Sequence, residues 1–292
     1  MNKSSAYFTL LVLALSFGCN ENDMLLKDYD PVSIYNIPKT TVEKAKFPVI
    51  DIHTHNYPES NKEIEEWVKA LDNSGIEKSI ILSYETGEEF DEVVERYSKY
   101  KDHFYLWCGF DYTGFNKEGW SEKAVQELER CFKAGAKGVG ELGDKGEGLL
   151  YSKPTEAIGM HIDDPRMQPL LKKCGELGMP ISIHVAEPYW MYLPMDEHND
   201  GMMNAELWQI DKSKENILLH AELVVTLENA VKNNPNTTFI ACHLVNSNHD
   251  LNILGNLFDK YPNLYADISA RFAEFAAVPR RTKAFFEKYQ DR

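Results

Sequence analysis

The feature that most constrains the fold is a regular alternation of apolar, strand-like runs with amphipathic, helix-like stretches. The strand-like runs are Val49–His53, Ser79–Tyr84, Phe104–Phe110, Ala136–Leu142, Ile181–Ala186, Thr238–Leu244 and Leu264–Ile268. The helix-like stretches are Lys62–Asn73, Glu88–Tyr100, Glu118–Lys133, Pro165–Leu177, Glu222–Asn233, Asp250–Lys260 and Arg281–Gln290. A strand followed by a helix, repeated along the chain, indicates a parallel sheet covered by helices. The pattern therefore predicts an α/β fold.

The number and spacing of these units predict a TIM (β/α)8-type barrel, a fold that takes about 250 residues. The chain has 292 residues, so one such barrel would use most of it. The spacing places an eighth strand just after Arg292, where the sequence stops. We therefore expect residues 47–292 to form a barrel that is truncated at its C-terminal end and lacks the eighth strand.

The first residues have the features of a targeting segment. Lys3 precedes an apolar run from Tyr7 to Phe17 that is too short to span a bilayer, and the run closes on Gly18-Cys19. This resembles a bacterial lipoprotein signal in which Cys19 is lipidated, and a plainly cleaved signal is the alternative. We expect residues 1–19 to be the signal segment and residues 20–46 a polar tether. The protein would then be exported, to the periplasm or as a lipoprotein associated with the outer membrane.

Net charge and cysteine positions indicate which partners and which disulfide bonds to expect. A net charge of −15 argues against nucleic acid as a partner, because phosphates require clustered Lys and Arg. A small-molecule substrate is the expected partner, with membrane contact only through the lipid anchor, and homo-oligomer formation stays open. Cys108, Cys131, Cys174 and Cys242 lie in strand-like or helix-like runs, so we expect buried free thiols rather than disulfides.

A metal site is indicated by Asp51-Ile-His53-Thr-His55, which ends the first strand-like run. Side chains two residues apart on a strand point the same way, so His53 and His55 share a face. Two imidazoles are half a metal site, because a catalytic zinc needs about three protein ligands and an open position. Alone, the motif is equally compatible with two surface histidines.

The other candidates follow further strand-like runs, where barrel active sites lie. Glu141 ends the fourth run, His184 the fifth and His243 the sixth, while Asp267 and then Arg271 follow the seventh. Any one of these histidines alone is more often a core or loop residue. Four histidines at three strand ends are much harder to explain in that way.

These motifs together resemble the amidohydrolase superfamily, in particular its amidohydrolase-related (amidohydrolase 2) branch of metal-dependent hydrolases and decarboxylases. The resemblance covers roughly residues 47–292. It depends on Asp51-Ile-His53-Thr-His55, Lys137-Gly-Val-Gly-Glu141, Asp163-Asp164-Pro165-Arg166, Pro180-Ile-Ser-Ile-His184, Ala241-Cys-His243 and Tyr261-Pro-Asn-Leu-Tyr-Ala-Asp267-Ile-Ser-Ala-Arg271. The family's last ligand, an aspartate at the end of the eighth strand, has no counterpart in the sequence.

The resemblance implies a divalent metal held by His53, His55 and His184, with Glu141 as a further ligand and His243 as acid/base or ligand to a second metal. Zinc is the first expectation, with manganese or nickel as alternatives. Beside the resemblance, Asp51 is expected to hold a ligand histidine through its N–H group. Lys145 and Arg271 are candidates for binding a substrate carboxylate or phosphate, with solvated surface charges as the alternative, and His220 is a candidate in a substrate loop. For Asp267 we expect a structural role with Arg271.

Three functions remain open from the sequence. The first is a metal-dependent hydrolase that uses an activated water on an ester, lactone or amide of a small molecule. The second is a non-oxidative decarboxylase of the same branch, a lyase that uses the metal to hold an acidic substrate. The third is a non-catalytic binding lipoprotein. We prefer the hydrolase, although fold and metal do not determine the reaction.

Overall fold

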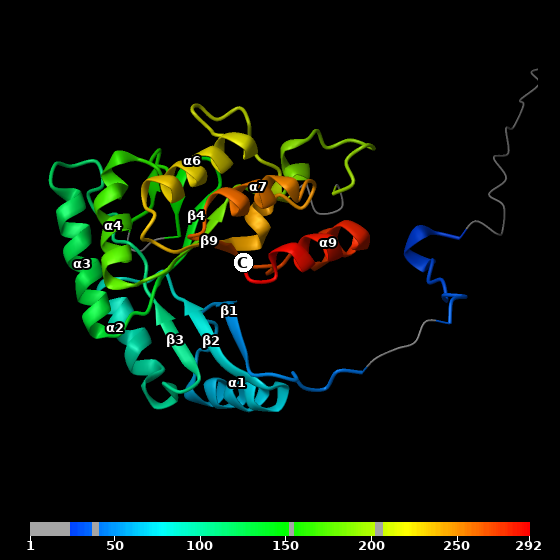
Figure 1. Ribbon diagram of the computed structural model, residues 1–292, viewed down its shortest axis with the longest axis horizontal. Helices are drawn as coiled ribbons and strands as arrows, with labels where there is room; N and C mark the ends of the chain where they lie inside the picture. The colour runs from blue at the N-terminus through cyan, green and yellow to red at the C-terminus, as the bar shows by residue number, and fades with distance from the viewer. Residues whose placement is uncertain (1–23, 37–40, 152–154, 202–206) are drawn as a thin grey trace, which may run out of the picture. The chain divides into compact units, whose positions relative to one another are not determined.

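The computed structural model describes residues 24–36, 41–151, 155–201 and 207–292 (Figure 1). The chain divides into two units, residues 1–42 and 43–292. The described part of the first unit is exposed and contains one 3-10 turn, Leu26–Asp28. Cys19 and the signal segment lie outside the described residues, so the lipid anchor stays a prediction. Within the described ranges, no helix has the length and apolar character needed to cross a membrane.

The second unit contains parallel strands that follow one another in chain order, as the alternation predicts. These are β1 (Val49–Thr54), β2 (Ile76–Leu82), β3 (Phe104–Trp107), β4 (Val139–Asp144), β7 (Ile181–Val185), β8 (Phe239–Ala241) and β9 (Leu264–Ala266). Backbone pairing joins β1-β2-β3 in one sheet and β4-β7-β8-β9 in the other. A parallel bridge between Cys108 and Val139 links the two sheets. The predicted α/β fold is therefore confirmed.

Helices follow the strands at the predicted places. They are α1 (Asn61–Ser74), α2 (Gly87–Arg96), α3 (Trp120–Ala134), α4 (Gln168–Leu177), α6 (His220–Asn233), α7 (Asn252–Lys260), α8 (Phe272–Ala276) and α9 (Pro279–Tyr289), with 3-10 turns η2 (Ser98–Tyr100), η3 (Pro165–Met167), η4 (Tyr189–Tyr192) and η5 (Cys242–Asn246). The caps explain where several begin and end. Ser60 and Glu63 form a capping box before α1. Asp164 accepts the N–H of Arg166 at the start of η3, and Gly178 ends α4 in the left-handed conformation.

Alternate residues of β2 face two different layers. Ile81 packs in a cluster with Ile64 of α1 and Val93 of α2, whereas Ile80 and Leu82 pack with Trp107 and with residues from both sheets. Those last neighbours are Ile52 of β1 and Ile240 of β8. Because β1 and β8 lie in different sheets, their contact with one cluster shows that the strands curl around a common interior. Among the described strands, β1 and β9 are not paired with each other.

Two features of the fold concern predictions from local sequence. A short antiparallel hairpin, β5 (Gly148–Leu150) and β6 (Ala157–Ile158), extends the end of β4, and the periodicity did not indicate it because each strand is too short. The four cysteines of the described part are free and buried, which confirms the prediction of free thiols.

A buried ion pair joins the end of β4 to the segment after β6. Asp144 is fully buried, and its Oδ2 lies 2.8 Å from Nδ1 of His161. Burial lowers the pKa of His161, but the hydrogen bond to Asp144 outweighs it and raises the pKa above its ordinary value. A raised folded-state pKa stabilises the protein below the unfolded value of about 6.5, and this contribution is lost as pH rises through the folded value.

We therefore expect His161→Gln to lower the free energy of unfolding by about 2 kcal/mol below pH 6.5, as for a hydrogen bond between charged groups. At alkaline pH the difference between variant and wild type should shrink. Urea unfolding from pH 5.5 to 9.5 measures it, with His198→Gln as an exposed control. A difference that stays constant or grows with pH would contradict the assignment.

Candidate metal centre

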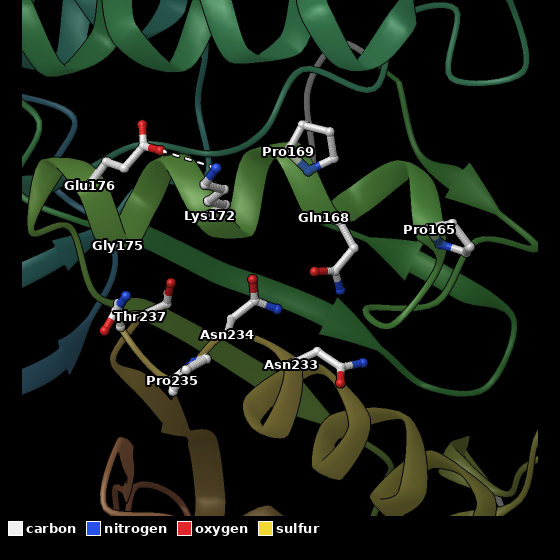
Figure 2. A pocket seen from close by; sticks show the side chains of 11 residues that line it. Pro165, Gln168, Pro169, Lys172, Gly175, Glu176, Asn233, Asn234, Pro235 and Thr237 are labelled. Atoms are coloured by element: carbon white, nitrogen blue, oxygen red, sulfur yellow. Dashed lines mark ion pairs between the residues drawn. The ribbon is translucent and has the colours of Figure 1, made fainter.

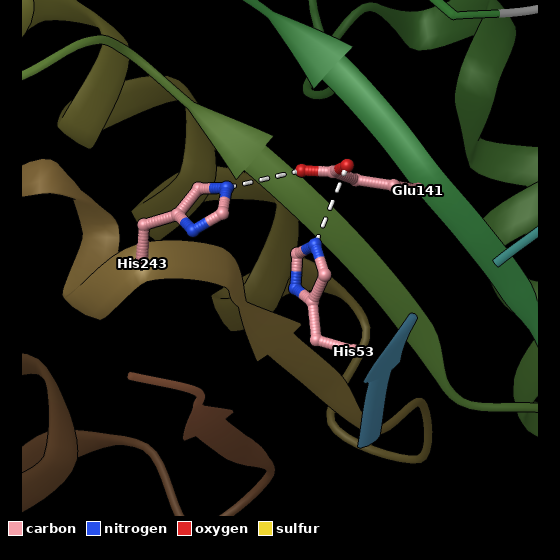
Figure 3. Close-up of side chains that lie close together, drawn as sticks. All are labelled: His53, Glu141 and His243. Carbon is pink, nitrogen blue, oxygen red and sulfur yellow. Dashed lines mark ion pairs between the residues drawn. The ribbon is translucent and has the colours of Figure 1, made fainter. Parts of the chain in front are cut away.

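Histidine and carboxylate side chains from separate strands meet at the carboxyl ends of the sheet. They come from β1 and the residue after it (His53, His55), β4 (Glu141), β7 (His184), η5 after β8 (His243) and the residue after β9 (Asp267). Figure 3 shows His53 and His243 pointing at Glu141 from two sides. The structure thus brings together the four histidines and the glutamate that the sequence singled out.

The Glu141 carboxylate lies at the centre of the cluster. Its Oε1 is 3.2 Å from His184 Nδ1 and 3.3 Å from His243 Nε2. Its Oε2 is 3.4 Å from His55 Nε2 and 3.6 Å from His53 Nε2. The rings of His53 and His184 lie 4.9 and 4.7 Å from the ring of His243. One carboxylate is therefore surrounded by four imidazole nitrogens.

Three of the imidazoles are held from behind by oxygen acceptors. His53 Nδ1 lies 2.8 Å from Asp267 Oδ2, His55 Nδ1 3.1 Å from the Leu82 carbonyl, and His243 Nδ1 2.8 Å from the Ser269 carbonyl. A carbonyl or ionised carboxylate accepts only, so each Nδ1 must carry the proton. In each neutral ring the Nε2 lone pair then faces Glu141.

This convergence of lone pairs fits a cation. Glu141 Oε1 is buried and has no hydrogen-bond donor among the described residues. Burial raises the pKa of Glu141, but the surrounding histidines hold it far below its ordinary range. Burial likewise opposes protonation of His53, yet the Asp267 and Glu141 carboxylates raise its pKa to about 10. Because the residues favour positive charge at their centre, and because imidazole and carboxylate are ligands of zinc and manganese, the site is suited to a divalent metal.

Local backbone features bring these side chains close. A Cβ added at Gly140 would lie 2.8 Å from Ser182 Cβ on β7, so glycine allows β4 to approach β7 beside Glu141. The predicted strand Thr238–Leu244 ends earlier, at Ala241. From His243 to Asn246 the backbone has φ of 51° to 59°, a left-handed turn. The Asp267 carboxylate accepts the His243 N–H at 2.9 Å and so supports this turn.

The two aspartates have contacts that differ from those expected. Asp51 accepts the backbone N–H of His53 at 3.1 Å, and no contact with an imidazole is found for it in the described chain. Asp267 instead contacts the His53 imidazole directly, and none of its hydrogen bonds in the described chain is to Arg271. Asp267, which we expected to be structural, is therefore the residue that orients His53.

The predicted substrate-binding residues are engaged with neighbouring groups. Lys145 forms a close ion pair with Glu187. Arg271 donates to Asn246 Oδ1 through Nε, at 2.8 Å, and through Nη2. His220 lies 3.0 Å from the carbonyl of Asn246 through its Nε2. These three residues surround the centre without contacting Glu141, and a role in binding substrate stays a prediction.

Glu187 and Asn246 belong to the site although the sequence did not single them out. Glu187 Oε2 lies 3.4 Å from His184 Nε2, and Asn246 Nδ2 lies 3.3 Å from the same nitrogen. Each follows a predicted site histidine by three residues, in His184-Val-Ala-Glu187 and His243-Leu-Val-Asn246. A polar residue one turn after a histidine at a strand end was the available signal.

The Asp267→Asn variant is expected to bind zinc about 10- to 100-fold more weakly, as for other residues that orient a ligand histidine. The asparagine oxygen would keep the N–H groups of His243 and Ser269, leaving its NH2 against His53 Nδ1. That would force the proton of His53 onto Nε2, facing Glu141. Competition titration with a chelating dye measures the affinity, with Asp259→Asn, an exposed partner of Lys288, as control. Equal affinities in variant and wild type would contradict this role.

A cavity of about 930 Å³ lies apart from this centre, along α4 and the segment that precedes β8 (Figure 2). Its polar lining includes Gln168, Asn233 and Asn236. None of the residues around Glu141 lines it, so its size alone does not make it the active site.

Comparison with solved structures shows what the fold is similar to. One is a structure described as an amidohydrolase from Staphylococcus aureus, with a TM-score of 0.51 and 13% identity over 81% of this chain and 85% of that chain. A second is a 2,6-dihydroxybenzoate decarboxylase in complex with 2,6-dihydroxybenzoate, with a TM-score of 0.46 and 17% identity over 77% of this chain and 80% of that chain. A third is a manganese-bound 5-carboxyvanillate decarboxylase from Novosphingobium aromaticivorans, with a TM-score of 0.43 and 14% identity over 78% of this chain and 77% of that chain. The similarity to the first supports a fold of the TIM-barrel type.

Sequence comparison gives the family. No curated protein matches the sequence. The family model described as Amidohydrolase matches residues 50–292, which include every residue around Glu141. The chain therefore belongs to the amidohydrolase family.

Proposed function

We propose that this protein is a metal-dependent hydrolase that cleaves an ester, lactone or amide of a small molecule. The observation that carries the proposal is the convergence of four imidazole nitrogens on the buried Glu141 carboxylate, whose Oε1 has no hydrogen-bond donor in the part of the chain that the structure describes. Members of the amidohydrolase family bind a divalent metal, and the donor set found here suits one.

His53, His55, His184 and Glu141 would hold the metal, with zinc as the first candidate and manganese or nickel as alternatives. When bound, a divalent cation would supply a Lewis acid that polarises a carbonyl and lowers the pKa of a water. The chain's part is to fix the ligands, and the acceptors behind His53 and His55 do so by keeping their protons on Nδ1.

His243 is proposed as the general acid and base. Its Nδ1 proton is held by the Ser269 carbonyl, so Nε2 faces the centre with a free lone pair. It can take a proton at Nε2 from the attacking water and pass it to the leaving group. Because burial leaves only 7% of the residue exposed, this proton is kept from bulk solvent during the transfer.

The experiment combines metal analysis with product analysis. The purified chain is assayed by elemental analysis and then with a panel of esters, lactones and amides in ¹⁸O-labelled water. About one or more equivalents of metal and ¹⁸O in the product acid would support the proposal. Carbon dioxide release from acidic substrates without ¹⁸O incorporation would replace it with the decarboxylase. A folded protein without metal or turnover would indicate a binding protein.

We also propose that the protein is exported and anchored by lipid at Cys19. The support is the apolar run after Lys3 that closes on Gly18-Cys19. Labelling cells with a radioactive fatty acid tests it. The label should appear in the wild type and be absent from Cys19→Ser, and equal labelling of both would contradict it.

A further inference from the structure

His184 faces the metal centre through the opposite ring nitrogen from the other histidines. His53, His55 and His243 direct Nε2 at Glu141, whereas His184 directs Nδ1 at it, 3.2 Å from Oε1. For a neutral imidazole to offer a lone pair there, its proton must be on Nε2. The surroundings of Nε2 therefore decide whether His184 can be a ligand.

Two groups lie next to His184 Nε2. The first is the side-chain amide of Asn246, whose nitrogen is a hydrogen-bond donor with other acceptors nearby. Asn246 Oδ1 accepts from the Arg271 guanidinium, which fixes the amide with its nitrogen toward His184. The two hydrogens of that nitrogen have the carbonyls of Val185, at 3.3 Å, and Ala186, at 3.0 Å, as acceptors. The contact to the Val185 carbonyl is as long as the contact to His184 Nε2, but the two carbonyls are enough for the two hydrogens, so Asn246 does not need Nε2 as an acceptor.

The second group is Glu187, whose Oε2 lies 3.4 Å from His184 Nε2. This carboxylate is buried, with 4% of the residue exposed, and its other oxygen forms the ion pair with Lys145. Tyr192 Oη accepts the backbone N–H of Glu187 at 3.1 Å, which fixes the start of the loop after β7. Glu187 is thus a held, ionised acceptor aimed at one nitrogen of His184.

We infer that Glu187 is a positioning residue that keeps the proton of His184 on Nε2, so that His184 binds the metal through Nδ1. Lys145 then has a structural part in the site, because it holds the second oxygen of the same carboxylate. In this arrangement three histidines face the centre through Nε2, and His184 faces it through Nδ1. The inference rests on the proposed metal-dependent function only for the second of the two readouts below.

The first readout is the tautomer of His184. Long-range ¹H–¹⁵N spectra of the metal-free chain, labelled with ¹⁵N-histidine and recorded where imidazoles are neutral, distinguish the two nitrogens. The His184 signals are assigned by their absence in His184→Gln. We expect the wild type to show the proton of His184 on Nε2. Finding it on Nδ1 would overturn the inference before any Glu187 variant is made.

Glu187→Gln should reverse this tautomer. The side-chain oxygen of the glutamine would accept from Lys145, so the NH2 group of the glutamine would face His184 Nε2. Because NH2 is a donor, His184 Nε2 would have to be an acceptor, with its lone pair free and the proton on Nδ1. Glu147→Gln is the matched control, since Glu147 also pairs with a lysine, Lys214, but touches none of the histidines. Circular dichroism shows whether each variant is folded. A folded Glu187→Gln protein that keeps the Nε2 proton would overturn the inference.

The second readout is zinc affinity by competition with a chelating dye. We expect a loss of about 10- to 100-fold in Glu187→Gln and no change in Glu147→Gln. An unchanged affinity in Glu187→Gln would show that His184 does not bind zinc through Nδ1. If the wild type binds no metal at all, the proposed function fails, while the tautomer spectra still decide the role of Glu187.

Discussion

The His53→Ala/His55→Ala variant is expected to lose its bound divalent metal and to lower kcat/KM by about 10³-fold or more, since metal catalysis contributes several kcal/mol to the barrier. Both imidazoles direct Nε2 at Glu141. Their removal leaves His184, His243 and Glu141, so the site lacks two of the four proposed metal ligands. Elemental analysis and steady-state kinetics on the most active substrate of the panel measure the two effects.

The control for this variant replaces two histidines that lie away from the centre. His103 pairs with the exposed Asp72, and His198 is a highly exposed neighbour of Glu197. His103→Ala/His198→Ala should keep both metal and activity. Full metal content in the His53/His55 variant would contradict the proposed ligand set, even if activity were lost.

His243→Gln is expected to retain about one equivalent of metal and to lower kcat by 10²- to 10⁴-fold, the usual contribution of a general acid or base. The reason is that its Nε2 faces the centre while its Nδ1 proton is fixed on the Ser269 carbonyl. Metal content and kcat are measured on the same preparation. This pair of readouts separates two roles that the sequence left open.

Loss of metal together with activity in His243→Gln would assign His243 as a ligand instead. Unchanged kcat with retained metal would remove it from the mechanism. Thr226→Ala is a suitable control, because Thr226 is also buried and its hydroxyl donates to the Leu223 carbonyl within α6. That variant should leave metal content and kcat close to the wild-type values.

The elements and the histidine cluster were predictable because they depend on local patterns. Apolar runs marked β1, β2 and β7, and the rule that parallel strands end at one edge of a sheet brought His53, Glu141 and His184 together. The end of β8 was less predictable. Apolar residues continue past Ala241, yet the backbone turns left-handed at His243, a change that periodicity does not reveal.

Charged residues just past strand ends were the least predictable part. Lys145 and Arg271 looked free to bind an acidic substrate, but their partners, Glu187 and Asn246, lie in the segments that follow β7 and β8. Asp267 likewise orients His53 from 214 positions away in the chain. Contacts of such separation depend on the register of the whole sheet, which a single sequence does not contain.

The contact between Asp267 and His53 has a consequence for how the site is assembled. His53 lies on the first of the parallel strands and Asp267 directly follows the last, so this hydrogen bond joins the two ends of the strand order. A portion of the chain that lacks either strand therefore lacks the contact that orients His53. Bound metal should therefore slow the exchange of amide hydrogens in β1, which carries His53, and to a smaller extent in β9, because opening of β9 would remove the contact by which Asp267 orients that ligand.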